Sequence, residues 1–177
     1  MTQAFDAAFR SLEIRMSDGS ILLVRAFDPD DFPVLVEMYK GFDPKRVAQG
    51  LPPPDVPRIA QWLDRLQSKS RALLALDGKR VVGHAILCPI SDASIEYTIF
   101  VHQDYRCQGV GEALTRLALD WVSEMGFAEV FLTTELSNIP ALSLYRKFGF
   151  RIQSAFGDEC EMKINVASRS GSLPRAA

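Results

Sequence analysis

A loop with two glycines joins an expected strand to an expected helix, and its residue types suit the binding of a phosphate group. Residues 105–113 read Tyr-Arg-Cys-Gln-Gly-Val-Gly-Glu-Ala. Free backbone N–H groups and the helix dipole attract anions to a helix N-terminus. Gly109 and Gly111 carry no side chain that would keep a phosphate away from these N–H groups, and Arg106 adds a planar cation. The loop therefore predicts a phosphate site, with a tight turn that binds nothing as the alternative.

Two common nucleotide-binding motifs are absent from this loop. A P-loop would continue with Gly-Lys-Ser or Gly-Lys-Thr, which does not follow here. A dinucleotide fingerprint would place a third glycine where Leu114 stands. A nucleotide-binding interaction domain is therefore a distant alternative.

A second segment, residues 138–150, reads Asn-Ile-Pro-Ala-Leu-Ser-Leu-Tyr-Arg-Lys-Phe-Gly-Phe. It resembles N-x-x-A-x-x-L-Y-x-K-x-G-F, the second signature of the GNAT family of N-acetyltransferases. Arg106-x-x-Gly109-x-Gly111 resembles the Q/R-x-x-G-x-G/A signature of the same family. The two segments keep the family's order, about thirty residues apart with one expected strand between them. The resemblance covers roughly residues 21–165 and is strongest from Arg80 onward.

The resemblance implies acetyl-CoA as the acyl donor. In the family, the CoA pyrophosphate lies on the loop that here runs from Arg106 to Gly111. The pantetheine arm pairs with the backbone of the preceding strand, as an added strand would, where the two central parallel strands diverge. The cofactor-binding residues implied in this way are Ile99, Phe100, Val101, Arg106, Cys107, Gln108, Gly109, Val110, Gly111, Glu112, Asn138 and Tyr145.

Acetyl transfer from a thioester to an amine requires the amine to be neutral. An alkyl amine has a pKa near 10.4, so only about one molecule in a thousand is neutral at physiological pH. A carboxylate can remove the proton directly or through water. Glu96 is the candidate base, because it lies on the strand expected to carry the pantetheine, where family members often have a glutamate. The alternatives are a surface glutamate at this position, a base at Glu135, or an amine that arrives neutral.

Tyr145 is the candidate general acid for the departing CoA thiolate. The usual pKa values of a thiol and a phenol, near 8.5 and 10, make this proton transfer feasible. The alternative is a structural tyrosine on the apolar face of its helix, with Leu142 and Phe148. By the same resemblance, a backbone N–H near Ile99 would polarise the thioester carbonyl. Cys107 is interpreted as a small loop residue.

The acceptor site is expected in the N-terminal half, around residues 41–54, with Phe42, Asp43 and Arg46 as candidate substrate-binding residues. Asp43 could pair with a cationic amine, whereas Arg46 could meet a carboxylate. Each of these residues could equally belong to a surface loop. The sequence therefore predicts a primary amine on a small molecule, peptide or protein, without choosing between them. The alternative of another class is a catalytically silent module that senses acyl-CoA.

The elements that must position these residues predict an α+β fold. Residues 95–101 indicate a strand, because Ile95, Tyr97, Ile99 and Val101 alternate with Glu96, Thr98 and Phe100. A helix at 110–125 and a strand at 129–134 complete a β-α-β unit with parallel strands. Asp28 and Asp55 are expected to cap two earlier helices. We expect a single GNAT-type domain at 11–166, a mixed twisted sheet of about six or seven strands with helices on both faces, an N-terminal arm at 1–10 and a disordered tail at 167–177.

Composition sets the remaining expectations. The 177 residues are 47% hydrophobic with a net charge of -2, so no global field predicts nucleic acid or an anionic membrane as a partner. Three separated cysteines and two histidines predict neither a disulfide framework nor a metal site. The sequence has no secretory signal or membrane-spanning run, and a cytoplasmic location is expected. Several family members dimerise, so a homodimer is an expectation without an assigned interface.

Overall fold

The computed structural model describes residues 9, 11–16, 18–43 and 52–167. The chain packs as two compact units. The N-terminal unit comprises Phe9–Ile86 and Ile99–Thr115, and the C-terminal unit comprises Leu87–Thr98 and the chain from Arg116 onward. The expected arm at 1–10 and tail at 167–177 fall almost wholly outside the described residues and stay predictions.

Eight strands form a mixed sheet in the order β1-β2-β3-β4-β5-β6-β8-β7. Strands β5 and β6 are parallel, whereas β1–β2, β2–β3, β6–β8 and β7–β8 are antiparallel. The α+β prediction is confirmed, but the expected count of six or seven strands was slightly too low; the short β1 and the exposed β7 are the two edge strands. The bounds are β1 Leu12–Arg15, β2 Ile21–Ala26, β3 Arg71–Asp77, β4 Arg80–Pro89, β5 Ser94–Val101, β6 Glu129–Glu135, β7 Arg151–Phe156 and β8 Glu159–Asn165.

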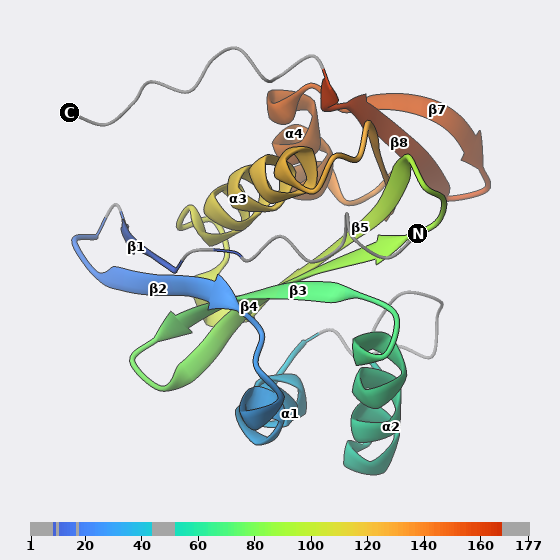
Figure 1. Cartoon of the computed structure of the whole chain (residues 1–177). Coiled ribbons are helices and arrows are strands. Elements are labelled where there is room, and N and C mark those ends of the chain that lie inside the picture. Colours follow the sequence, from blue (N-terminus) through green and yellow to red (C-terminus); the bar gives the residue numbers. More distant parts are fainter. Residues whose placement is uncertain (1–8, 10, 17, 44–51, 168–177) are drawn as a thin grey trace. The chain divides into compact units, whose positions relative to one another are not determined.

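Two helices, α1 (Phe32–Lys40) and α2 (Val56–Gln67), lie side by side on one face of the N-terminal unit's strands (Figure 1). Asp55 caps α2 as predicted, whereas α1 begins after Asp31 and the predicted cap, Asp28, belongs to the short 3-10 turn Pro29–Asp31 that precedes it. Asp28 accepts a hydrogen bond from the Asp30 N–H in a short 3-10 turn before α1, and Asp55 accepts one from the Arg58 N–H. Their apolar stripes form a continuous core with the strands, made of Leu35, Val36, Met38, Tyr39, Phe42, Ile59, Leu63, Leu74, Leu76, Val81, Ile86 and Phe100.

The first turns of α3 (Val110–Glu124) pack against the other face of these strands. A Cβ atom added to Gly83 of β4 would lie 2.7 Å from Leu114 Cδ1 and 3.1 Å from Val110 Cγ1. These two side chains therefore occupy the space that a side chain at position 83 would need. Helices thus cover both faces, as the sequence predicted.

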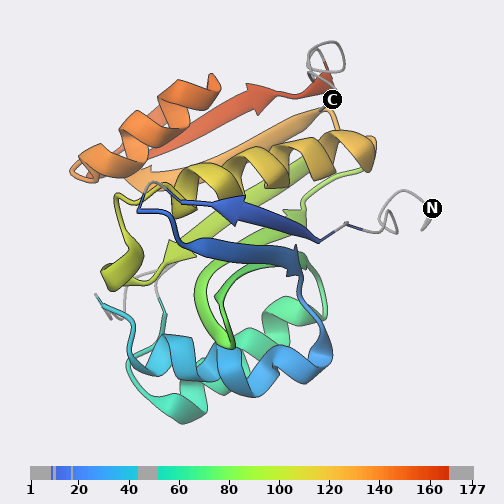
Figure 2. The ribbon, with the colours of Figure 1, turned by 90° about the vertical axis from the view of Figure 1, so that its left-hand side faces the viewer.

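In the C-terminal unit, α4 (Ile139–Phe148) lies beside β8 (Figure 2). The parallel ladder between β5 and β6 joins Ser94 to Glu129 and ends at the pair Glu96–Phe131, although both strands continue. This short pairing agrees with the expected divergence of the two strands. No helix within the described residues is long and apolar enough to cross a membrane.

A buried polar pair lies inside the N-terminal unit's core. The Tyr39 hydroxyl is 2.7 Å from His84 Nδ1, and both side chains are almost completely inaccessible to solvent. Burial lowers the pKa of His84 to about 3 and raises the pKa of Tyr39 well above its usual value. His84 is therefore neutral at physiological pH.

We expect His84 to make the fold sensitive to acid. The unfolded chain binds a proton at this residue below pH 6.5, whereas the folded chain does so only near pH 3, so stability falls as pH falls through this window. The contribution is about 1.4 kcal/mol for each pH unit. Urea unfolding of wild type and His84→Asn at pH 7 and pH 5 should show a smaller loss of stability in the variant. An equal loss in both proteins would contradict this role.

Candidate functional site

The glycine loop has the predicted strand–loop–helix context. Strand β5 ends at Val101, a 3-10 turn spans Gln103–Tyr105, and α3 begins at Val110. The Ala113 N–H donates to the Gly109 carbonyl at 2.9 Å, which places Gly109 immediately before the first helical turn. By helical geometry, the N–H groups of that turn point out of the N-terminal end of α3. The loop can therefore present backbone donors and the positive end of a helix dipole to an anion.

Two residues of the loop adopt left-handed backbone conformations. Gly109 has φ of +95°, and a Cβ atom there would lie 3.4 Å from Met16 Cε. Cys107 has φ of +59°, the one positive value at a non-glycine residue among those that the structure describes, and its side chain is exposed. Nothing in the sequence signals this conformation, because cysteine has no special preference for it.

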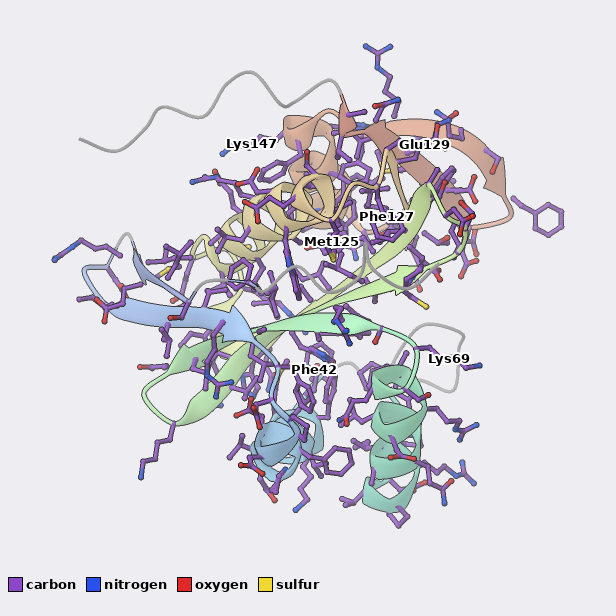
Figure 3. The ribbon with its side chains drawn as sticks, in the orientation of Figure 1. Phe42, Lys69, Met125, Phe127, Glu129 and Lys147 are labelled. Carbon is purple, nitrogen blue, oxygen red and sulfur yellow. The ribbon has the colours of Figure 1, made fainter. Side chains whose placement is uncertain are left out.

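Arg106 is held by the protein itself. Its Nε donates to the Val101 carbonyl at 3.0 Å and its Nη2 donates to the Asp43 carbonyl. The guanidinium also lies over the Phe42 ring, 5.2 Å from the ring centroid. Phe42 lies just beyond the end of α1 (Figure 3). Arg106 therefore joins the end of β5 to the segment that follows α1, and its predicted contact with phosphate stays a prediction.

Gln103, the first residue of the 3-10 turn after β5, also connects this turn to the segment that follows α1. Its Nε2 donates to the Gly41 carbonyl at 2.7 Å, and its Oε1 accepts from the Asp43 N–H at 3.2 Å. Phe42 and Asp43, predicted to bind the acceptor, thus lie beside the glycine loop within the N-terminal unit. Arg46 lies outside the described residues. The sequence analysis missed Gln103, since a single glutamine after a strand carries no signal.

A second set of contacts holds the loop to the β3–β4 hairpin. The Tyr105 hydroxyl donates to Asp77 Oδ2 at 2.7 Å, and Arg80 Nη2 lies 3.1 Å from His102 Nε2 and 3.4 Å from Asp104 Oδ2. Burial, and then the charge of Arg80, lower the pKa of His102, which favours a neutral ring. Further along the loop, Gln108 Nε2 donates to the Asp104 carbonyl at 2.7 Å. The loop is therefore fixed from both sides.

The end of β5 is anchored by an aromatic cluster. The Phe100 ring is 5.6–5.7 Å from the rings of Tyr39, Phe42 and Trp62, with nearly perpendicular ring planes. Phe100 is buried, whereas Ile99 and Val101 are half-buried. The Phe100 side chain thus fixes the strand to α1 and α2, and its predicted contact with a cofactor stays a prediction.

Glu96 lies on the same strand, within the C-terminal unit. Its side chain is exposed, whereas those of Ile95 and Tyr97 are buried, as the predicted alternation requires. It is also the last β5 residue paired with β6. The carboxylate is therefore open to solvent at the point where the two strands stop pairing.

The second sequence motif folds as α4 and its two ends. The Asn138 side chain accepts from the Ala141 N–H at 3.3 Å and caps the helix, and Gly149 ends it. Phe150 follows with its ring 5.7 Å from that of Tyr145. Tyr145 is 6% exposed, and burial raises its pKa to about 12. Asn138, Gly149 and Phe150 of the motif thus have local structural roles at the ends of α4. The phenol of Tyr145 stays protonated across the physiological pH range.

A protein-family model described as the acetyltransferase (GNAT) family matches residues 34–150 of this chain. Among curated proteins, human N-acetyltransferase 8 is 30% identical over 79 residues, covering 41% of this chain and 35% of that protein. Mycothiol acetyltransferase of Clavibacter sepedonicus is 36% identical over 96 residues, covering 53% of this chain and 30% of that protein. The chain thus spans about a third of the length of these relatives.

Solved structures share the fold at low sequence identity. The GNAT domain of S. lividans PAT has a TM-score of 0.77 at 17% identity, covering 88% of this chain and 96% of that chain. A putative acetyltransferase from Salmonella typhimurium, determined with its cofactor acetyl-CoA, has a TM-score of 0.67 at 18% identity, covering 88% and 99%. Both likenesses concern the fold alone.

We expect Arg106 to stabilise the protein even without a ligand. Arg106→Ala removes two hydrogen bonds to carbonyls and the contact with Phe42, and should lower the free energy of unfolding of the ligand-free protein by about 1–2 kcal/mol. Urea unfolding measures this loss, and Lys79→Ala, in the exposed turn before β4, serves as the control. If Arg106 serves only to bind phosphate, both variants will match wild type in the absence of ligand.

Proposed function

The chain belongs to the acetyltransferase (GNAT) family, and from this premise we propose that it is an N-acetyltransferase that passes the acetyl group of acetyl-CoA directly to a primary amine. The observation that carries the proposal is the loop from Arg106 to Gly111. Along the chain, this loop leads from the end of β5 to the N-terminus of α3, and Gly109 within it has a left-handed conformation. A strand edge followed by a helix N-terminus suits a ligand with an extended amide-bearing arm and a pyrophosphate.

The donor would use the backbone rather than side chains. The first-turn N–H groups of α3 would bind the pyrophosphate, and the β5 backbone from Ile99 to Val101 would pair with the pantetheine amides. The Ile99 N–H would donate to the thioester carbonyl as it becomes an oxyanion. Such donors are already oriented, because Phe100 and Arg106 fix the strand end and the loop.

Glu96 is the proposed base. Its exposed carboxylate can accept the ammonium proton directly or through water, after which the nitrogen lone pair attacks the thioester carbon. The C–N bond forms, the carbonyl becomes an oxyanion, and its collapse breaks the C–S bond. The second amine proton leaves to solvent, and CoA departs as the thiolate.

Tyr145 is proposed to assist the departing thiolate as a hydrogen-bond donor. Its pKa of about 12 lies about three units above that of a thiol, so complete proton transfer to the sulfur would be uphill. A hydrogen bond that strengthens as negative charge develops on the sulfur lowers the barrier without such a transfer. The elevated pKa also keeps this donor protonated throughout the working range of the enzyme.

The acceptor would lie on the side of Phe42 and Asp43. Arg106 and Gln103 hold the backbone of these residues beside the loop proposed to bind the donor. The relatives include a mycothiol acetyltransferase and an N-alpha-acetyltransferase from Schizosaccharomyces pombe, the latter 33% identical over 86 residues. Because these names imply different acceptors, the relatives leave the class of acceptor open.

Turnover should be measured as CoA thiol released in the presence of a polyamine, free amino acids, a peptide with a free N-terminus and a lysine peptide. We expect release with at least one amine. Tyr145→Phe should lower kcat at least tenfold, with little change in the KM for acetyl-CoA, because the lost hydrogen bond acts as the C–S bond breaks. Unchanged kcat in Tyr145→Phe would exclude this role.

The same assay tests Glu96 through its pH profile. Glu96→Gln should depress turnover most near neutral pH and recover toward high pH, where the amine loses its proton unaided. Glu161→Gln, an exposed glutamate on β8, is the matched control. A profile for Glu96→Gln that superimposes on wild type would remove Glu96 from the mechanism. Acetyl-CoA binding without release for any amine would favour an acyl-CoA sensor.

A further inference from the structure

Strand β7 ends the sheet with its side chains unusually open to solvent. It pairs only with β8 in the strand order, and it is the outermost strand beside β8 (Figure 1). All six of its side chains are exposed, including Ile152 at 41% and Phe156 at 93%. An edge strand presents backbone N–H and C=O groups on its outer side, and these are a template for pairing with another strand.

A bulge brings Ile152 and Ala155 to the same face of this edge strand. The register with β8 shifts between Ile152 and Ser154, so that Gln153 is the extra residue. Ile152 then lies opposite Met162 and Ala155 opposite Cys160, and both β8 partners are completely buried. The bulge therefore brings two apolar side chains of β7 to the core side of the sheet, where they remain exposed at its edge.

On the other face of the β7–β8 hairpin, basic residues lie at one end and acidic residues at the other. Arg151 lies opposite Lys163 at one end, whereas Phe156 lies opposite Glu159 at the other end, next to Asp158 and near Glu161. Lys163 is engaged by Glu129 at 3.1 Å, which leaves Arg151 as the exposed cation at its end. One end is thus basic and the other acidic.

We propose that β7 is a homodimer interface, in which two copies pair antiparallel across a twofold axis and continue the sheet from one copy into the other. A twofold antiparallel register that uses all six residues sets Ile152 against Ala155 of the second copy, so apolar side chains meet on the core side. On the other face it sets Arg151 against Phe156 of the second copy, with Glu159 of that copy one strand further.

The charge pattern of the β7–β8 hairpin favours a second copy of this chain as the partner that pairs with β7. The antiparallel arrangement brings each basic end against the acidic end of the other hairpin, twice in every dimer, with an arginine over an aromatic ring between them. Parallel pairing would instead set like charges together. The same strand thus matches itself in backbone pattern, in apolar contacts and in charge.

Sedimentation velocity of the full chain over a wide range of concentration tests the proposal. Wild type should form a dimer, and Ile152→Asp, which puts a charge on the apolar face, should be a monomer. Ile90→Asp alters another exposed isoleucine, in the loop after β4, and should leave the dimer intact. A wild type that stays monomeric throughout, or a dimer that Ile152→Asp leaves intact, would overturn the proposal.

A charge exchange identifies the partner as a second copy in this orientation. Arg151→Glu and Glu159→Arg should each raise the dimer dissociation constant about tenfold, and the double variant should restore it. Hydrogen exchange supplies a measurement without substitution, because β7 amides should be protected in the concentrated protein and exchange faster on dilution. Two results would contradict the antiparallel pairing: a double variant in which the two losses of dimer affinity add, or β7 amide exchange rates that do not depend on protein concentration.

Discussion

The contact between α3 and the strand surface at Gly83 determines where the helix N-terminus lies. Val110 and Leu114 fill the space that a side chain on Gly83 would take, so the first turns of the helix rest directly on β4. The end of the helix that can bind an anion is therefore fixed relative to the end of β5, only a short loop away. A bulkier residue at position 83 would lift the helix, and its backbone donors would no longer be held next to that strand end.

The loop between these elements is fixed by residues that could also be taken for ligand-binding groups. Arg106 has the charge and shape to bind phosphate, yet its donors reach the carbonyls of Val101 and Asp43 and its plane covers Phe42. Gln103 and Tyr105 hold the same loop through Gly41 and Asp77. Side chains therefore supply rigidity, and under the proposed function the backbone at the N-terminus of α3 would bind the ligand. This division of roles suits a cofactor whose anionic group is recognised by a helix N-terminus.

Local features of the structure could be predicted from the sequence, because their causes lie within a few residues. Asp55 caps α2 as predicted, Asp28 caps the 3-10 turn just before α1, and the alternation around Glu96 places that residue on the exposed face of its strand. Contacts between distant segments could not be predicted in the same way. Tyr39 and His84 are 45 positions apart, and Gln103 reaches Gly41 across 62. Single residues at such separations carry no periodic signal, and the left-handed backbone of Cys107 has no signal in the sequence either, because cysteine has no preference for that conformation.

The central claim is that this loop and strand end bind acetyl-CoA, and calorimetric titration of the purified protein with acetyl-CoA tests it most directly. The account predicts saturable binding with a micromolar dissociation constant, retained with desulfo-CoA and absent with ATP. It also predicts that Gly109→Glu abolishes binding, because a carboxylate there would meet the pyrophosphate in a backbone conformation that favours glycine. Thermal melting would show that this variant still folds. Absence of binding by the wild-type protein, or full affinity in Gly109→Glu, would contradict the account.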